Sequence, residues 1–371
     1  MSHSTEPLVG ILGGYGAVGA SAARCLAAEG GVRLRLGGRR AEQARRLAAG
    51  LGAEPVTVDA ADDASLLAFG RGCDVVLNCA GPAYLLRDRP RRAAAAVGAA
   101  YVDVMDGGGT APPDERTAVL SAGLSPGLSG LLPRLLAEGL ARPLRFTGHY
   151  VGLGALTTTG AADYLLSLDR GYGVPLAGWR AGRVVPGALS MLPEHGIPGL
   201  PRPVTAYPYL LDEIARQAEE LGLESADWYN GFDGHYLLDA LNRQRSGVQD
   251  FDAACEELVR AGALDVVGRE PYHVLWGALD GLDAEGAAVR RSGLIRGSDG
   301  SELTGVVGAA AVRELLAGRV ALGAHQASRV LAPATVVEAL RRHLPATVVA
   351  VTQAAPFDGG AEDDEFEDGE L

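Results

Sequence analysis

Short apolar runs alternate with stretches of helical periodicity through the first third of the chain. The first run, at 8–12, leads through a glycine-rich turn into the helical pattern of 20–28. Further apolar runs of strand length stand at 32–36, 55–59, 74–78, 100–104 and 117–122. Because strands that alternate with helices build a parallel sheet with helices on both faces, this part of the chain is predicted to be an α/β domain.

The pattern changes after residue 144, where strands and helices no longer alternate. Helical periodicity is expected at 161–168, 210–221, 236–245 and 251–261, and a stretch rich in proline and glycine covers 171–208. Residues 272–280 and 287–296 alternate like two strands joined by a turn. These features predict a second, α+β domain. Two later helical patterns, at 306–316 and 333–343, are expected to return to the first domain.

The glycine-rich turn after the first apolar run has the form of a dinucleotide-binding motif. Gly13 or Gly14 would turn the chain off the strand, Gly16 would let a pyrophosphate approach the backbone, and Gly19 would let the helix pack on the strand. A helix start of this kind offers free N–H groups to an anion. The motif therefore predicts a Rossmann-type, doubly wound sheet, with the phosphates on the N–H groups of four residues: Tyr15, Gly16, Ala17 and Val18.

The second apolar run indicates which dinucleotide is bound. It ends in Gly38-Arg39-Arg40, where an NAD enzyme would place an acidic residue on the ribose 2′-hydroxyl. Two arginines after a glycine leave room for a 2′-phosphate and supply planar donors for it. We therefore expect NADP(H) as the cofactor. The alternative is that Arg39 and Arg40 only begin a solvated helix.

Taken together, these patterns predict four parts of the chain. We expect an NADP-binding domain at 1–130, a substrate or dimerisation domain at 131–305, and C-terminal helices at 306–350 that pack back on the first domain. The segment 351–371 contains a dense acidic run and is expected to be a disordered tail.

Composition excludes several functional classes. The net charge is −13 and every one of the 33 basic residues is arginine, so nucleic-acid binding and any lysine-based chemistry are not expected. The four cysteines lack paired spacing, and the histidines lack the spacing of metal ligands, so no disulfide framework and no metal site are expected. Neither a signal peptide nor a membrane span is visible. We expect a cytoplasmic protein that acts on a small molecule.

With these elements placed, the chain resembles the saccharopine dehydrogenase-like reductases. The resemblance rests on the glycine motif and on four further segments: Val58-Asp59-Ala60-Ala61-Asp62, Asn78-Cys79-Ala80-Gly81-Pro82, Tyr101-Val102-Asp103 and Gly123-Leu124-Ser125-Pro126-Gly127. It extends weakly into the C-terminal half. It implies that the segment at Asp59 and Ala60 meets the adenine, and that the Asn78 to Pro82 segment passes the ribose and nicotinamide. The family reduces imines formed from amino acids, and relatives reduce enoyl double bonds.

The segment Gly123 to Gly127 also matches the nucleophile elbow of hydrolases. In that elbow the residue after the serine donates its N–H to the oxyanion hole, and Pro126 has none. We interpret the segment as a tight turn into a helix, with Pro126 in the first helical turn.

Hydride transfer to an imine also needs a proton donor and a substrate anchor. Tyr84 and Asp103 are the candidate donors, because each follows a strand end beside the nicotinamide segment. Their alternatives are an aromatic packed between domains and a loop-holding hydrogen bond. His149 and His235 are second choices. The arginines that might hold a substrate carboxylate are Arg87, Arg170, Arg180 and Arg183.

Three functions are consistent with these features. The first is an NADPH-dependent reductase of a small-molecule imine in amino-acid or specialised metabolism. The second is an enoyl reductase acting in trans on a carrier-bound chain, for which 153–166 would line an apolar channel. The third is a non-catalytic nucleotide-binding scaffold. A small, carboxylate-bearing substrate is expected for the first, and a homodimer is compatible with all three.

Overall fold

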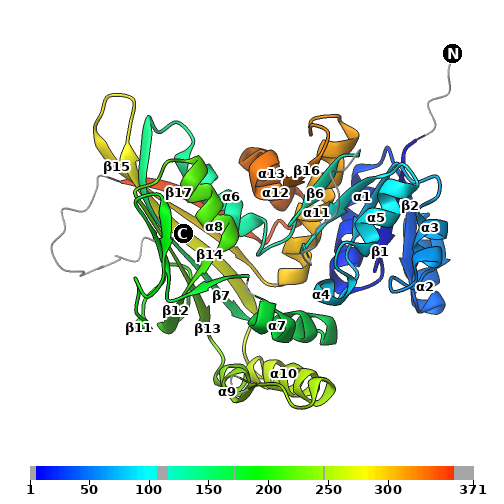
Figure 1. The fold of residues 1–371 in the computed structure, drawn as a ribbon, viewed down its shortest axis with the longest axis horizontal. Helices are drawn as coiled ribbons and strands as arrows, with labels where there is room; N and C mark the ends of the chain where they lie inside the picture. Colours follow the sequence, from blue (N-terminus) through cyan, green and yellow to red (C-terminus); the bar gives the residue numbers. More distant parts are fainter. Residues whose placement is uncertain (1–5, 107–115, 171, 245–246, 355–371) are drawn as a thin grey trace.

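The computed structural model describes residues 6–354 except 107–115, 171 and 245–246, and these residues form two sheets. The first sheet, at the right of Figure 1, has seven strands in the order β16-β6-β5-β4-β1-β2-β3, and every neighbouring pair is parallel. This confirms the predicted doubly wound sheet. Its strands are Leu8–Leu12 (β1), Arg33–Gly38 (β2), Glu54–Thr57 (β3), Val75–Asn78 (β4), Ala100–Asp103 (β5), Ala118–Leu120 (β6) and Ala324–Gln326 (β16).

Helices cover both faces of this sheet, as a parallel sheet requires. One core joins Ile11 and Leu77 to Val307 of the returning helix, and another gathers around Phe69 on the opposite face. The helices of this domain are Ala17–Glu29 (α1), Ala41–Leu51 (α2), Asp63–Gly70 (α3), Ala83–Leu86 (α4), Arg89–Ala96 (α5) and Gly300–Leu316 (α11).

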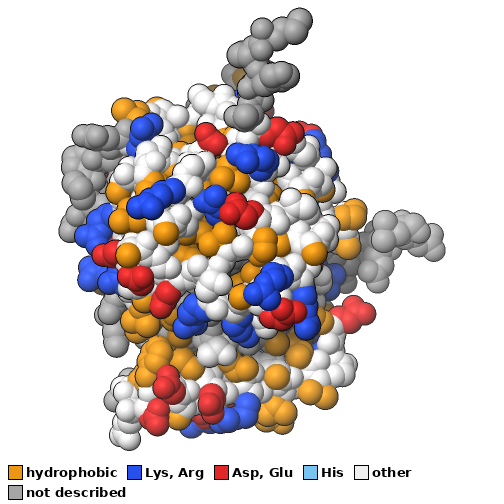
Figure 2. All heavy atoms as spheres, turned by 90° about the vertical axis from the view of Figure 1, so that its right-hand side faces the viewer, with side chains coloured by type: hydrophobic (Ala, Val, Ile, Leu, Met, Phe, Trp, Pro, Cys, Tyr) orange, Lys and Arg blue, Asp and Glu red, His pale blue; other side chains and the backbone are white. Residues whose placement is uncertain are grey.

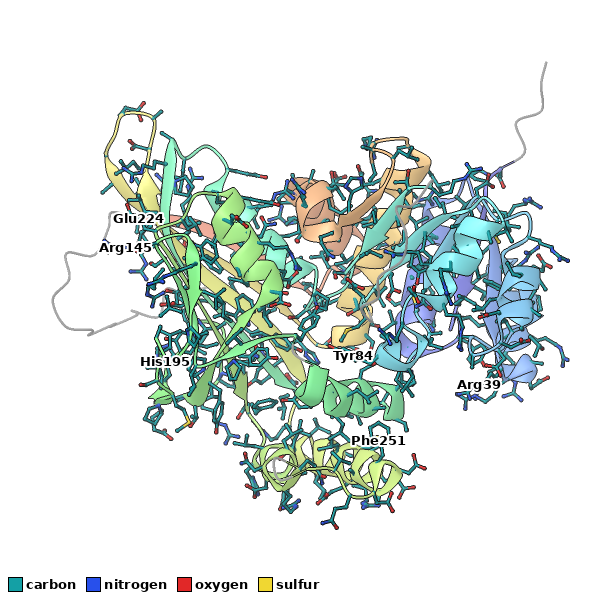
Figure 3. The ribbon with its side chains drawn as sticks, in the orientation of Figure 1. Arg39, Tyr84, Arg145, His195, Glu224 and Phe251 are labelled. Carbon is teal, nitrogen blue, oxygen red and sulfur yellow. The ribbon has the colours of Figure 1, made fainter. Side chains whose placement is uncertain are left out.

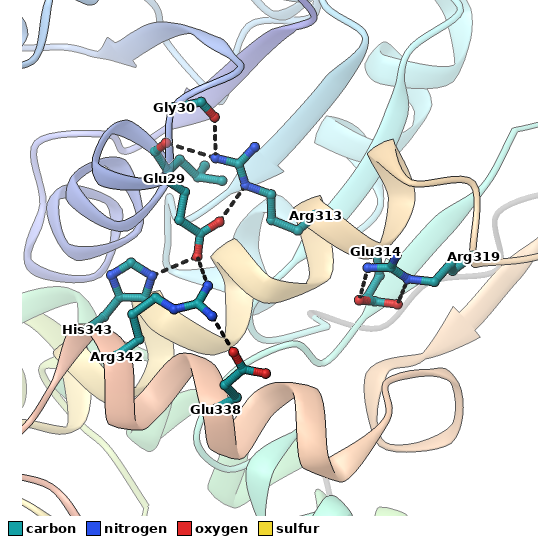
Figure 4. Close-up of polar contacts among 9 residues, drawn as sticks. Glu29, Gly30, Arg313, Glu314, Arg319, Glu338, Arg342 and His343 are labelled. Atoms are coloured by element: carbon teal, nitrogen blue, oxygen red, sulfur yellow. Dashed lines mark hydrogen bonds and ion pairs between the residues drawn. The ribbon is translucent and has the colours of Figure 1, made fainter.

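The C-terminal helices are fastened to the end of α1 by charged groups. Glu29, the last residue of α1, lies 2.7 Å from Arg313 Nε of α11 and 2.7 Å from His343 Nε2 of α13 (Pro333–His343) (Figure 4). Arg313 Nη2 also donates to the carbonyl oxygens of Leu26 and Gly30, which end α1. The predicted return of α11 and α13 to the first domain is thus confirmed, and buried charge pairing fixes it.

The second sheet is mixed and lies at the left of Figure 1. Its main path runs β10-β9-β13-β7-β14-β15-β17, with β8, β11 and β12 off this path. The two predicted strands after residue 272 form the hairpin of β14 and β15. The strands are Arg142–Leu153 (β7), Gly173–Pro175 (β8), Gly178–Arg180 (β9), Arg183–Val185 (β10), Leu192–His195 (β11), Val204–Leu211 (β12), Ser225–Phe232 (β13), Tyr272–Leu282 (β14), Ala288–Gly297 (β15) and Val348–Ala354 (β17).

Helices α6 and α8 pack on one face of the second sheet, where Phe146 stacks on Trp228 inside the common core. Helix α7 continues from β7 towards the first domain, and α9 and α10 pack together beneath it (Figure 1). The bounds of these helices are Leu128–Ala137 (α6), Thr158–Arg170 (α7), Asp212–Glu220 (α8), His235–Gln244 (α9) and Phe251–Asp265 (α10), and the short Ala327–Val330 (α12) precedes α13.

The structure differs from the sequence expectations at several boundaries. The helix expected from 210 begins at Asp212, because Leu210 and Leu211 complete the buried strand β12. Helix α6 begins at Leu128, so Pro126 lies in the turn before it and not in its first turn. The expected tail begins too early, since 351–354 form half of β17; residues 355–371 lie outside the described part. Within the described residues, no helix is long and apolar enough to cross a membrane.

Candidate functional site

The turn between β1 and α1 has the geometry of a phosphate-binding turn. Gly13 has a φ of +69°, and a Cβ atom on it would lie 2.7 Å from the carbonyl oxygen of Cys79. A Cβ atom on Gly19 would lie 2.3 Å from Gly13 O, so only glycine lets α1 approach the strand this closely. A Cβ atom on Gly16 would meet only Gly13 O, at 3.2 Å, which leaves the outer side of the turn open.

The start of α1 leaves donors for an anion. Within the described residues, no side chain caps this helix and its first turn holds no acidic residue. Because the first N–H groups of a helix lack helical partners, those of Ala17 and Val18 suit a pyrophosphate. The N–H of Gly16 donates to Gly13 O at 2.9 Å instead, so the expectation that it binds phosphate is wrong.

Tyr15 links this turn to the end of β2. Its hydroxyl accepts a hydrogen bond from the N–H of Arg40 at 2.6 Å, and the Arg40 guanidinium lies 5.8 Å from its ring centroid. Gly38 is required here, because a Cβ atom would lie 2.3 Å from the Tyr15 ring. Arg39 and Arg40 are exposed, and Figure 3 shows Arg39 at the outer end of the first domain. The pair is therefore available to a 2′-phosphate.

The segment after β3 continues the same edge of the sheet. The N–H of Val58 donates to Gly38 O at 3.2 Å, which brings the following Asp59 and Ala60 beside the end of β2. Asp59 is exposed, and its Oδ1 accepts from the N–H of Ala61 at 2.9 Å. This position agrees with contact to an adenine.

A buried polar clamp shapes the segment after β4. Asn78 Oδ1 accepts from the N–H of Ala80 at 3.1 Å, and Asn78 Nδ2 donates to Asp103 Oδ2 at 3.1 Å. Asp103 also accepts from Tyr101 Oη at 2.5 Å and from the N–H of Met105 at 3.0 Å. Burial raises the pKa of the Asp103 carboxyl, while these three donors act to lower it. With both oxygens engaged, Asp103 holds the segment that runs through Cys79 and Ala80 to Gly81 and Pro82.

Helix α7 of the second domain closes over the end of this segment. A Cβ atom on Gly81 would lie 2.6 Å from Thr159 Cγ2 and 3.1 Å from Asp163 Oδ2. Asp163 Oδ1 accepts from the N–H of Tyr84 at 3.4 Å. Burial raises the pKa of Asp163 to about 6, with a further contribution from the Asp103 charge. No sequence motif marks Asp163; only the approach of the two domains reveals it.

Tyr84 lies where the two domains meet, as Figure 3 shows. Its side chain is buried, and α4, to which it belongs, packs against α7. The structure thus places Tyr84 and Asp103 on the same edge, next to the nicotinamide segment. It adds Asp163 as a carboxyl group that approaches this segment from the other domain.

A second polar pair was missed by sequence reasoning. Tyr150 Oη lies 2.9 Å from His273 Nδ1, on adjacent strands β7 and β14. Glycines surround the imidazole: a Cβ atom on Gly154 or Gly300 would lie 3.0 Å or 3.2 Å from Nε2. Burial lowers the pKa of His273 and raises that of Tyr150, which favours neutral forms of both. Tyr150 then donates to Nδ1, so Nε2 carries the hydrogen.

This pair lies at the start of α11, close to the carboxyl edge of the first sheet. Gly300 is the first residue of α11, and Thr304 one turn later accepts from the N–H of Leu124 at 3.3 Å. A Cβ atom on Gly123 would lie 2.4 Å from Val104 O, directly after Asp103. These contacts connect the His273 region to the end of β5.

The other sequence candidates lie elsewhere. His149 precedes Tyr150 on β7 and so faces the opposite side of the sheet, where it stacks with His195, Tyr229 and Trp276. Burial lowers its pKa to about 3. His235 opens α9 and stacks on Tyr236.

The candidate arginines do not converge either. Arg180 is held by Asp227 at 2.5 and 3.2 Å, Arg87 and Arg183 are exposed, and the Arg170 side chain lies outside the described part. Figure 2 shows basic and acidic side chains interspersed on this face of the first domain.

The turn at Gly123 to Gly127 is held by a buried carboxylate. Glu213 of α8 accepts from the N–H of Gly127 at 2.9 Å and from the Ser129 hydroxyl. This contact fastens the second domain to the start of α6, so the turn is structural and the hydrolase reading gains no support. Among the described residues, no group of three or more His, Cys, Asp and Glu side chains could hold a metal ion.

Comparison with known proteins agrees with this geometry. Residues 9–121 match the family model described as saccharopine dehydrogenase NADP binding domain. The whole fold is similar to apo saccharopine dehydrogenase (L-Glu forming) from Saccharomyces cerevisiae, with a TM-score of 0.67 and 15% identity over 95% of this chain and 100% of that one. A short-chain oxidoreductase from Thermus thermophilus is 25% identical over 26% of this chain and 56% of that one, with a TM-score of 0.23. No curated protein matches the sequence.

Proposed function

Since residues 9–121 belong to the saccharopine dehydrogenase NADP-binding domain family, we propose that this protein is an NADPH-dependent reductase of a small-molecule imine. One observation carries the proposal. The segment from Asn78 to Pro82, expected beside the nicotinamide, meets a carboxyl group of the second domain, Asp163, whose pKa is raised to about 6. A carboxyl group with such a pKa can deliver a proton near neutral pH.

NADP(H) fits the residues at the other end of the site. The open turn at Gly16 and the free N–H groups of Ala17 and Val18 suit a pyrophosphate, and the exposed Arg39 and Arg40 suit a 2′-phosphate. When bound, the cofactor supplies the hydride.

The chain supplies the remaining chemistry. Asp103 and Asn78 fix the segment against which the nicotinamide would rest, and Asp163 holds a proton at Oδ2, the oxygen nearer Gly81. His273 Nε2, with Tyr150 fixing the tautomer, donates a hydrogen bond to an acceptor on the substrate. Tyr84 lines the same seam between the domains.

The enoyl-reductase alternative has no comparable support. The apolar residues of 153–166 were expected to line a channel, but Leu153 and Leu165 are buried in two separate cores. A long acyl chain would displace side chains that already stabilise the second domain.

Binding and turnover test the proposal separately. Fluorescence titration should show tight NADPH binding, and NADPH should be oxidised when imines are formed in situ from 2-oxo acids and amines. Failure to bind NADPH would overturn the cofactor assignment. Binding without turnover on any imine would favour the scaffold, or the enoyl reductase if a carrier-bound enoyl chain is reduced instead.

A further inference from the structure

Strand β17 is an open edge of the second sheet. It is the last strand of the main path and is paired along its length with β15, from Val348 opposite Arg296 to Ala354 opposite Arg290. Figure 1 shows it beside β15, at the end of the described chain. Six of its seven residues are exposed, so neither its faces nor its outer edge is covered by the described part of the chain.

The composition of this edge is unusual for one that faces water. The ten residues 345–354 carry no charge, and Val348 and Val351 are 45% and 48% exposed. Exposed edge strands usually carry a charge, a proline or a bulge that prevents pairing with another chain. In β17 the only such protection is at its start, where Arg341 Nη2 donates to Val349 O at 3.1 Å.

We propose that β17 pairs with β17 of a second copy of this chain, so that the two second sheets continue into one another. A twofold axis makes the pairing antiparallel, and each strand then offers the same surface to the other. An uncharged strand suits such self-pairing, because no like charges meet across it.

The charges on either side of β17 favour the same arrangement. Arg341, Arg342 and His343 precede the strand, and the 17 residues that follow it contain eight acidic and no basic residues. Antiparallel pairing brings the end of each strand, and thus the start of the acidic segment, next to Arg341 and Arg296 of the other copy. Opposite charges then meet at both ends, in a chain whose net charge of −13 would otherwise oppose association.

The mass in solution tests this interface, using the full chain and two variants. Val351→Lys places a charge in the middle of the pairing, whereas Val267→Lys changes an even more exposed valine, 72% exposed, in the turn after α10. We expect a wild-type dimer by light scattering or sedimentation, at least a hundredfold weaker association for Val351→Lys, and an unchanged dimer for Val267→Lys. Circular dichroism would verify that both variants fold.

Three results would overturn the proposal: a monomeric wild type at micromolar concentration, a Val351→Lys variant that remains dimeric, or equal weakening by both substitutions. If the wild type is monomeric and removal of 355–371 makes it dimeric, the chain's own C-terminal segment covers the edge instead. None of these measurements uses NADPH or a substrate, so they stand apart from the proposed reaction.

Discussion

Asn78 donates a hydrogen bond to Asp103 at 3.1 Å, which joins the carboxyl ends of β4 and β5 beneath the expected nicotinamide position. We predict that Asp103→Ala strands three buried donors, on Asn78, Tyr101 and Met105, and lowers the free energy of unfolding by about 3 kcal/mol. NADPH affinity should fall as well, because Asn78 no longer fixes the next segment. Urea unfolding and fluorescence titration measure the two effects; Asp252→Ala, on the exposed start of α10, is the control.

Arg39→Ala should reduce NADPH affinity by about a hundredfold and leave NADH affinity unchanged. The reason is loss of charge-assisted hydrogen bonds to the 2′-phosphate, a group that NADH lacks. Arg45→Ala, on the same side of the domain and paired with Glu42, provides the matched control. Equal loss for both cofactors, or none for either, would refute the 2′-phosphate assignment.

Gly16→Val and Gly19→Val should fail in different ways. At Gly16 a side chain meets little of the protein and would occupy the pyrophosphate position, so we predict a folded protein that does not bind NADPH. At Gly19 it meets Gly13 O at 2.3 Å, so the variant should lose stability as well. Thermal unfolding followed by cofactor titration distinguishes them. Normal NADPH binding by Gly16→Val would show that the phosphate turn is misplaced.

Asp163→Asn should remove a pH dependence as well as activity. A proton donor with a pKa of about 6 is protonated below that value, so kcat/KM for imine reduction should decline as the pH rises above about 6. We expect Asp163→Asn to lose about 10² in kcat, to abolish this decline and to retain NADPH affinity. Tyr84→Phe is the comparison. If only Tyr84→Phe impairs kcat, the proton comes through Tyr84.

Tyr150→Phe should raise KM for the imine more than it lowers kcat. Without the phenol, the hydrogen of His273 is no longer fixed on Nε2, and one substrate hydrogen bond weakens, at a cost of about 1 kcal/mol or roughly fivefold. His273→Gln should act in the same direction, and NADPH affinity should not change. Tyr236→Phe, an exposed tyrosine on α9, serves as control.

His149 should make the protein sensitive to acid. Its pKa falls from 6.5 to about 3 on folding, so the unfolded chain binds one more proton between these values. The free energy of unfolding therefore falls as the pH drops from about 6.5 towards 3, by at most about 4 kcal/mol from this group. His149→Phe keeps the ring stacking and should be more stable than the wild type at pH 5. An identical pH dependence of stability in both proteins would contradict this assignment.

The sequence by itself determined the nucleotide-binding half. The glycines of the turn, the arginines after β2 and the alternation of short strands and helices are local patterns, and each has one physical reading: a close backbone approach, an anion, a buried parallel sheet. The hairpin of β14 and β15 and the helix α13 were predictable for the same reason.

Only the tertiary structure decided the rest. Asp163 comes within reach of Gly81 because α7 crosses between domains, and Tyr150 meets His273 through pairing of strands more than a hundred residues apart. Likewise, β13 and β16 escape a sequence reading because their partners supply what their own patterns lack. A proton donor is defined by its surroundings, and long-range packing sets the burial that moves the pKa of Asp163. Residue type and spacing along the chain cannot encode that burial locally.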